Sequence, residues 1–435
     1  MSDTPTGAAE GRLGDFWDVI AELNASSPEE RLDAASRRAG RPARRRRSEE
    51  VNNHVHTTYS FSPYSPSAAV WAAREEGLST VGIVDHDSVA GAREFRKAGE
   101  ILGLPTTTGF EVRVSMAESA LADGRRFNSP DGPDMAYVVC HGLPHTALED
   151  ADALLSSVRR SREERNRRMV RRLNDELAGL GVPALSYEGD VRAISEAQRG
   201  GTVTERHIMY ALAQRVLREI GVGQPLVAFL REAMSLELSE SKERALADPA
   251  HPNLRYELLG LFKAEFVPRV YELPDAQECI PVSTAVESMR RFGAVPCYPY
   301  LGDVGESPTG DKKAQRFEDS FLDELFGELV RLGFQAVTYM PPRNTRAQLS
   351  RLQKLCRAHG LMEISGVDVN APTQSFRCPE TAEPAFRHLG DAAWALIEHE
   401  RAVEEGQGGL PEHGGRAAVP RLAERGRRRF ADRVR

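Results

Sequence analysis

Two segments in the first quarter of the chain combine metal-ligating side chains with the pattern of parallel β-strands. The first contains His54 and His56, whose side chains project from the same face if this stretch is extended. In the second, the apolar run Val81–Val84 ends abruptly in Asp85 and His86. A buried parallel strand is a continuous apolar run, and polar residues at its C-terminal end are typical of a barrel active site. Because neutral imidazole binds transition metals, the pattern predicts a metal site at the strand ends.

Short apolar runs alternate with helical patterns through most of the chain, which indicates an α/β fold with repeated strand–helix units. Helices are expected over residues 67–76, 88–102 and 147–180. The segment from about 184 to 275 breaks this rhythm and is expected to be a helical insertion over the mouth of a barrel. Further strands are expected at Pro105–Val114, Ala136–Cys140, Ala294–Cys297, Ala336–Tyr339 and Met362–Ser365.

Composition favours an ordinary cytoplasmic enzyme. The formal net charge of −7 argues against broad nucleic-acid binding, which usually shows as a basic excess. The five cysteines are scattered without CxxC spacing, as expected for reduced thiols rather than disulfides or a zinc ribbon. No stretch has the apolar length of a membrane span, and no signal-peptide core is found. The oligomeric state is left open.

Both ends of the chain are expected to be peripheral. Residues 1–48 are interpreted as a partly disordered N-terminal extension. It ends in the basic run Arg44–Arg47, which is either a solvated linker or a contact for nucleic acid or another anionic partner. Residues 401–435 are rich in Gly, Arg and Glu and are expected to form a flexible tail with a short helix near 419–430. The structured domain is therefore placed at 49–400.

The motifs between these ends resemble the polymerase and histidinol phosphatase (PHP) family of phosphoesterases over about 52–375. The resemblance implies a distorted (β/α)₇ barrel that holds divalent metals at the C-terminal ends of its strands. The subgroup most similar to this chain acts on small nucleotides or oligonucleotides. The motifs that carry the resemblance are His54-Val55-His56-Thr57, Asp85-His86-Asp87, Gly109-Phe110-Glu111, Arg165-Asn166-Arg167-Arg168, Thr204-Glu205-Arg206-His207 and Gly366-Val367-Asp368.

Carrying the family's ligands over residue by residue gives one nearly complete metal position. It consists of His54, His56, Glu111 and Asp368. The resemblance also implies that His86 faces a neighbouring ion with Asp85 behind it as an orienting carboxylate, and both are assigned to catalysis. The remaining positions implied for metal binding are His141, Tyr298 and Asn370.

This chain departs from the family pattern at three positions. Phe61 stands where an acidic residue is common, and Tyr298 and Asn370 stand where the family has histidine. Tyrosine and asparagine are weaker metal ligands than imidazole. The departures leave open one, two or three bound ions. They also leave open a barrel that binds a metal or nucleotide without catalysis, or a hydrolase of a non-phosphate bond.

Several cationic side chains are candidates for binding substrate. Arg165 and Arg168 lie three residues apart on one predicted helix, so both could reach a phosphate, and guanidinium matches phosphate geometry. Arg113 and His207 are further candidates. The predicted function is metal-dependent hydrolysis of a phosphate ester, such as a small nucleotide, an oligonucleotide or a sugar phosphate. Zinc, manganese or iron would suit the ligands.

Overall fold

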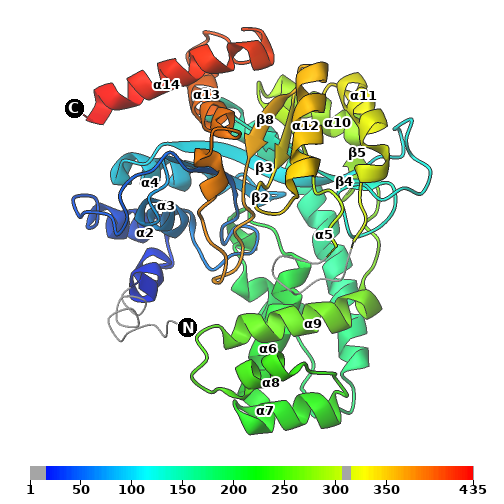
Figure 1. Ribbon diagram of the computed structural model, residues 1–435. Helices are drawn as coiled ribbons and strands as arrows, with labels where there is room; N and C mark the ends of the chain where they lie inside the picture. Colours follow the sequence, from blue (N-terminus) through cyan, green and yellow to red (C-terminus); the bar gives the residue numbers. More distant parts are fainter. Residues whose placement is uncertain (1–15, 306–314, 435) are drawn as a thin grey trace.

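The barrel consists of seven strands that form a nearly closed sheet. The computed structural model describes residues 16–305 and 315–434, and Figure 1 shows the sheet wrapped by helices. All neighbouring strands are parallel except β4, which runs antiparallel to both of its neighbours. In sheet order the strands are β1 (Val51–Val55), β2 (Thr80–His86), β3 (Thr106–Ser115), β4 (Met135–His141), β6 (Val295–Pro299), β7 (Ala336–Tyr339) and β8 (Met362–Ser365), while the short β5 (Ile280–Pro281) pairs with β3. The expected fold class, a distorted (β/α)₇ barrel with a helical insertion, is confirmed.

The sheet closes through the segment that follows β8. Val55 at the end of β1 forms a parallel bridge with Val369. The side chain of Asn52 accepts from the Val367 backbone N–H at 2.9 Å and donates to the Val367 carbonyl at 3.0 Å. These contacts hold the segment that follows β8 beside β1.

The outer face of the sheet is covered by helices and the inner face is enclosed. Successive side chains of a strand point to opposite faces, so Phe110 and Val112 of β3 pack under the helices while Glu111 points inward. The helices around the sheet are α3 (Pro66–Glu75), α4 (Ala92–Leu102), α5 (Leu148–Glu176), α10 (Val282–Arg291), α11 (Leu322–Leu332), α12 (Arg346–His359) and α13 (Arg387–Glu404).

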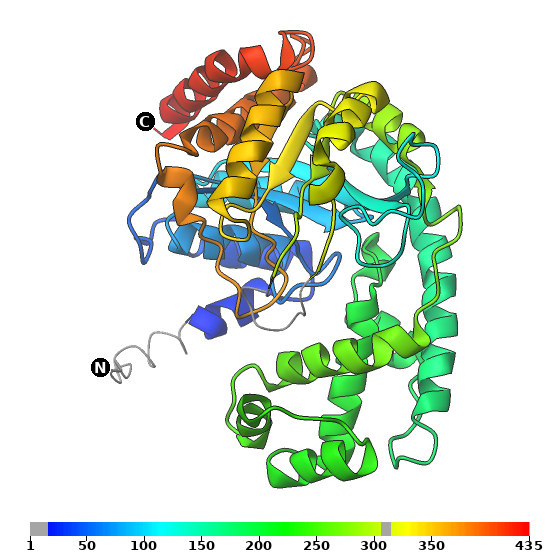
Figure 2. The same ribbon diagram turned by 45° about the vertical axis from the view of Figure 1, so that its right-hand side comes forward.

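The helical insertion has a hydrophobic core of its own. Figure 2 shows it as a separate lobe against the protruding half of α5. Met169 and Leu173 of α5 pack into this core, and Phe61 from the barrel joins it. The lobe is built from α6 (Glu205–Ile220), α7 (Gln224–Ala228), α8 (Glu240–Ala247) and α9 (Leu254–Val270). The boundaries assigned to the insertion and to the whole domain stay predictions.

The N-terminal extension is folded against the barrel from residue 16 onward. Residues 16–23 are helical and bury Ile20 and Leu23. The helix α2 (Pro28–Ser36) follows and begins with a capping box. The arginine run is fixed at its end, because the Arg47 guanidinium donates to the Ser79 carbonyl at 2.7 Å. The disorder expected for this extension needs correction for these residues, and residues 1–15 lie outside the described part.

The C-terminal segment also differs from the flexible tail expected from residue 401. The helix α13 extends to Glu404, and α14 (Val419–Val434) packs along it. Leu422 and Ala423 are buried against α13, and Arg425 and Arg429 pair with the buried Glu398. The tail is rich in arginine, and this composition suggested a flexible segment. In the folded chain, however, Arg425 and Arg429 pair with Glu398 of α13. Within residues 16–305 and 315–434, no helix combines the length and apolarity needed to cross a bilayer.

Candidate metal centre

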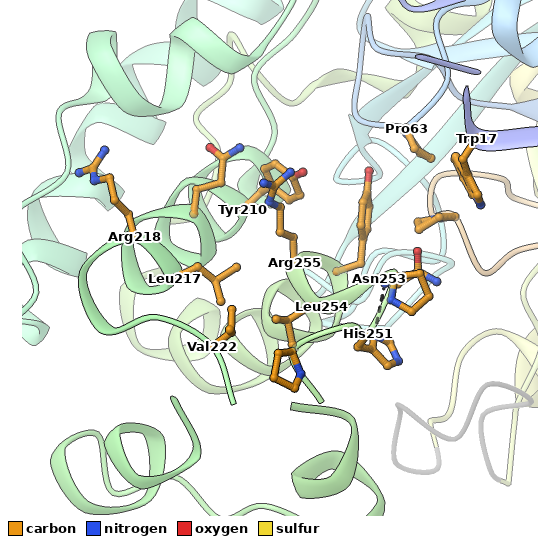
Figure 3. Close-up of a pocket in the computed structure, with 15 residues that line it drawn as sticks. Trp17, Pro63, Tyr210, Leu217, Arg218, Val222, His251, Asn253, Leu254 and Arg255 are labelled. Atoms are coloured by element: carbon orange, nitrogen blue, oxygen red, sulfur yellow. Dashed lines mark hydrogen bonds between the residues drawn. The ribbon is translucent and has the colours of Figure 1, made fainter. Parts of the chain in front are cut away.

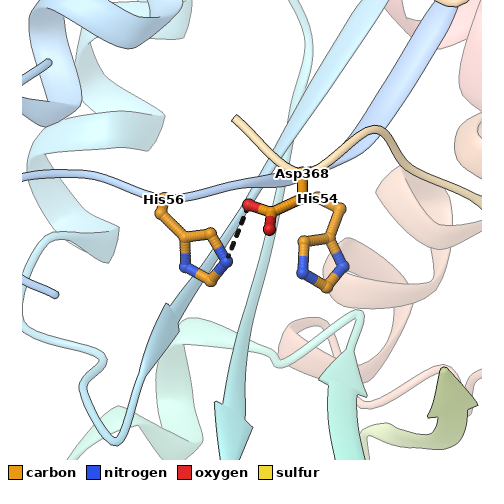
Figure 4. A group of neighbouring side chains, drawn as sticks. All are labelled: His54, His56 and Asp368. Carbon is orange, nitrogen blue, oxygen red and sulfur yellow. Dashed lines mark ion pairs between the residues drawn. The ribbon is translucent and has the colours of Figure 1, made fainter. Parts of the chain in front are cut away.

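Three candidate ligands meet where β1 ends and the segment after β8 closes the barrel. They are His54, His56 and Asp368, which offer ligand atoms that all lie within 4.8 Å of one another. The His56 Nε2 lies 3.5 Å from the Asp368 Oδ1, and Figure 4 shows this carboxylate between the two imidazoles. Strand β1 brings the histidines together, and barrel closure supplies the aspartate from the other end of the chain.

A second group shares His56 with the first. His86 at the end of β2 pairs in register with Glu111 of β3, and the Glu111 Oε2 lies 3.1 Å from the His86 Nδ1. The same oxygen lies 3.8 Å from the Nε2 atoms of His54 and His56. The rings of His56 and His86 stack with their centroids 4.6 Å apart. Three predicted ligands, His54, His56 and His86, therefore surround the Glu111 carboxylate, and Asp368 joins them through His56.

The surroundings shift the pKa values of His86 and His54 in opposite directions. The pKa of His86 lies well below its usual value because burial and the nearby charge of His56 oppose protonation. Burial is also the largest influence on His54 and lowers its pKa. The carboxylates of Glu111 and Asp368 outweigh burial, so the net pKa of His54 is raised. An unprotonated His86 has a free lone pair, which metal binding requires.

Asp85 orients the loop after His56 rather than His86, so its expected place behind His86 needs correction. Its carboxylate accepts hydrogen bonds of 2.6 Å each from the Thr57 N–H, the Thr57 hydroxyl and the Ser60 hydroxyl. The Ser60 Oγ lies 3.4 Å from the His56 Nδ1. The pKa of Asp85 is raised by burial. Asp85 thereby fixes the backbone that carries His56, and among the described residues its carboxylate hydrogen-bonds Thr57 and Ser60 rather than the His86 ring.

His141 faces the same side of the sheet as the two groups. Val139 of β4 pairs with Glu111, and His141 lies two residues further along the same strand face. The side chain is buried, and its Nε2 has no hydrogen-bond partner in the part of the chain that the structure describes. Burial and the charge of His54 lower the pKa of His141 to about 3. A buried imidazole nitrogen without a partner is compatible with a metal ligand.

The structure does not bring Tyr298 into the cluster, which corrects the expected ligand. Cys297 pairs with Val139 and so occupies the strand face of Glu111, whereas Tyr298 points to the opposite face. There its ring packs in the hydrophobic core, with its centroid 6.2 Å from that of Phe334. A shift of one residue along a strand reverses the face of a side chain.

Asn370 lies beside the cluster and orients one of its carboxylates. Its side-chain Nδ2 donates to the Asp368 Oδ1 at 2.7 Å, and the Arg206 guanidinium donates to its backbone carbonyl at 3.3 Å. Phe61 is removed from the ligands and packs into the insertion, where its ring contacts His207 at 4.9 Å.

Two of the predicted phosphate-binding arginines are instead buried in an ionic network. Arg113 and Arg165 both bind Glu278, at 2.8 and 2.6 Å, and each has a further carboxylate partner, Asp131 at 2.7 Å and Glu205 at 2.6 Å respectively. Their hydrogen-bond capacity is therefore committed to protein carboxylates. A helical spacing of three residues predicts a shared face but cannot show which carboxylates the fold places against it.

The other two substrate candidates also have structural partners. Arg168 is partly exposed and binds the Glu272 Oε2 at 2.6 Å. His207 is buried at the start of α6, where its Nδ1 accepts from the Thr204 N–H at 3.0 Å in a capping interaction. Burial lowers the pKa of His207 to about 3. Neither side chain contacts the ligands of the cluster.

Sequence reasoning missed the residues that support these groups. The Arg162 guanidinium pairs with Asp87, next to His86, and also binds Glu205 at 3.4 Å. Asp87 has a left-handed backbone conformation with a φ of 50°. Asp87 belongs to the Asp-His-Asp motif, so the motif itself was a signal. Glu205 lies within the Thr204-Glu205-Arg206-His207 motif, so that motif was also a signal, whereas no local pattern identified Glu278.

Comparisons with known proteins agree with the motifs. Residues 52–219 match the PHP domain family. The 5′-3′ exoribonuclease of Haemophilus influenzae is 27% identical over 161 residues, which cover 37% of this chain and 49% of that protein. The chain thus matches about half the length of this curated relative.

Two solved structures also resemble this chain. One is a candidate metal-dependent phosphoesterase from Bifidobacterium adolescentis, with a TM-score of 0.49 and 19% identity over 78% of this chain and 96% of that one. The other is an amidohydrolase from Chromobacterium violaceum with bound sulfate and no metal, with a TM-score of 0.48 and 19% identity over 78% and 95%.

Proposed function

Because residues 52–219 match the PHP domain family, we propose that this chain is a metal-dependent hydrolase of phosphate esters. The observation that carries the proposal is that two groups of potential ligands, His54/His56/Asp368 and His56/His86/Glu111, share His56 on the inner face of the barrel. These residues come from three strand ends and the closing segment. Such a concentration of potential ligands on one enclosed face favours a built site over scattered packing residues.

The donor set fits divalent metal ions. Imidazole and carboxylate together suit zinc, manganese or iron, and His56 is common to both groups, so two neighbouring ions can be accommodated. The unpartnered, buried nitrogen of His141 supports a further ligand on the same face. A divalent ion bound here would lower the pKa of a bound water and polarise a phosphate oxygen.

The surrounding residues position this site. Asp85 holds the loop after His56 through Thr57 and Ser60, and Asn370 holds Asp368. Partners of this kind typically change metal affinity or activity by roughly ten- to a hundredfold when removed. We therefore assign Asp85 and Asn370 to positioning, and His86 with Glu111 to the site itself.

The substrate that we propose carries a nucleotide. The relative with 27% identity is named a 5′-3′ exoribonuclease, and this favours a nucleotide or oligonucleotide over a sugar phosphate. All five cysteines are buried and unpaired, which suits a reducing compartment such as the cytoplasm.

Hydrolysis of a panel of phosphate esters tests the proposal, with free phosphate measured for nucleoside monophosphates and sugar phosphates and released nucleotides measured for short oligonucleotides. The protein is loaded in turn with manganese, zinc or iron. Glu111→Gln should reduce the rate at least about a hundredfold, because an amide cannot replace the charged oxygen shared by three imidazoles. Glu118→Gln, on an exposed carboxylate, is the matched control. No release from any ester by folded, metal-loaded protein would favour a barrel that binds without catalysis.

A further inference from the structure

Two adjoining cavities lie between the N-terminal extension and the helical insertion. Their volumes are about 930 and 460 Å³. Figure 3 shows Trp17 and Pro63 on one side of the larger cavity and the side chains of the insertion on the other. We call the two cavities together the interlobe groove. The residues that line both are Trp17, Pro63, Tyr210, Arg255 and Tyr256.

The interlobe groove borders the loops that carry two of the metal-ligand candidates. Thr58 and Phe61, which line the smaller cavity, belong to the loop that follows His56. Pro372, which lines the larger cavity, follows Asn370 in the loop after Asp368. A substrate whose phosphate reached the ligands would thus have its remaining part close to this groove.

Arg206 joins the groove to the metal centre. Its guanidinium lies 5.0 Å from the ring centroid of Phe61 and donates to the Asn370 carbonyl at 3.3 Å. Asn370 in turn binds Asp368. A cationic side chain therefore lies between Phe61, which lines the smaller cavity, and the loop after Asp368.

The chemistry of the groove suits nucleotides. Trp17, Tyr210 and Tyr256 are half-buried, so parts of their rings remain accessible, and the last two have ring centroids 5.5 Å apart. Arg255 is exposed and has no ion pair or hydrogen bond within residues 16–305 and 315–434. No described carboxylate lines either cavity. Aromatic rings beside a free guanidinium bind bases and phosphates of single strands.

We propose that the interlobe groove binds the nucleotides adjoining the scissile phosphate of a single-stranded oligonucleotide, an inference that rests on the proposed function. The groove gives a short binding site with few charges. The formal net charge of −7 likewise disfavours a long binding site that depends on many contacts to phosphates. Because Trp17 precedes the residues that match the PHP domain, the N-terminal extension contributes a substrate contact from outside that match.

Equilibrium binding of a fluorescent oligoadenylate of a few nucleotides tests the inference. Phosphorothioate linkages prevent turnover, so metal-loaded protein can be used. Trp17→Ala should weaken binding about tenfold through loss of base stacking, and Trp17→Phe should retain most of the affinity. Arg255→Gln should reduce the slope of log K against log salt by about 0.7, as expected for one lost contact to a single-stranded phosphate.

Arg244→Gln is the matched control, because this exposed arginine of the insertion lies outside both cavities. Thermal unfolding of each variant checks that the fold is retained, and exposed Arg255 provides an answer even if Trp17→Ala loosens the extension. Equal affinity and salt slope in all folded variants would overturn the inference. Groove-dependent binding without hydrolysis of any ester would support the groove as an oligonucleotide site but would contradict the proposed function, and with it the place of the groove beside a scissile phosphate.

Discussion

Glu111 is the residue on which both groups of candidate ligands depend. One of its oxygens lies 3.1 Å from His86 and 3.8 Å from both His54 and His56. The pKa of His86 is lowered, so its imidazole resists protonation and adds no positive charge beside the Glu111 carboxylate. A bound cation would complete the charge balance.

Arg165 and Arg168 give a test at the residue scale between structural and substrate-binding roles. Arg165→Ala should lower the free energy of unfolding by roughly 3 kcal/mol, because it removes a partner from the buried carboxylates of Glu205 and Glu278. Arg168→Ala breaks a partly exposed pair with Glu272 and should cost below about 1 kcal/mol. Urea unfolding of both variants measures the difference.

A different result would support the prediction from helix spacing that Arg165 and Arg168 both bind the phosphate of the substrate. If both variants unfolded like the wild type, and both lowered kcat/KM for a phosphate ester by a similar factor, the arginines would be substrate contacts. Arg159→Ala would not control for this, since its guanidinium binds Asp152 and the Asp87 carbonyl. Arg244→Ala on the exposed insertion is the better control.

Single residues differ in how far the sequence could place them. His54 and His56 were predictable because strand periodicity requires only local geometry. Tyr298 was misplaced because its face depends on a register of one residue, which is set by pairing with β4. The partners of Arg113 and Arg165 lie far away in the sequence, so no local pattern indicated that they would be buried.

At the scale of elements, the closure of the barrel depends on the glycine before the last ligand. A Cβ at Gly366 would lie 2.2 Å from the His54 Cβ and 2.9 Å from the His54 backbone nitrogen. Neither contact can be relieved by a flexible side chain, so β1 or the segment after β8 must shift. Both carry ligands of the metal centre.

Gly366→Ala should therefore damage the site as well as the fold. We expect a loss of roughly 1–3 kcal/mol in the free energy of unfolding from overpacking. We also expect about a hundredfold slower phosphate release, because displacement of ligands by about 1 Å has effects of that size. Thermal unfolding and a rate assay with saturating metal measure the two effects.

Gly327→Ala is the control for Gly366→Ala. Gly327 lies within α11, and no atom lies within 4 Å of a Cβ added there. Alanine also has the higher helix propensity, so this variant should be unchanged or slightly stabilised. Wild-type activity in Gly366→Ala would show that the close approach to His54 does not position the site.

The bounds of some strands could be predicted from the sequence, whereas strand direction and helix packing could not. The strands β7 and β8 were predicted at their observed bounds, Ala336–Tyr339 and Met362–Ser365, because short apolar runs between helices have few alternatives. The direction of β4 was not predictable from its own residues, since direction is set by pairing. The packing of α14 depends on Glu398, a buried acid that becomes its partner only in the folded chain.

At the scale of the whole molecule, the barrel and the insertion each have a hydrophobic core, and the N-terminal extension lies against both. The barrel supplies the candidate ligands, while the interlobe groove requires all three parts. The two proposals can be tested separately, because none of the candidate metal ligands lines the groove.

The central claim is that His54 and His56 hold a metal ion together with Glu111, His86 and Asp368. Its most direct test is the metal content of purified protein by mass spectrometry, after expression with manganese, zinc and iron supplied. The wild type and the control His359→Ala with His413→Ala should retain at least one ion per chain. His54→Ala with His56→Ala should retain none while remaining folded. Equal metal content in all three proteins would contradict the assignment of this centre.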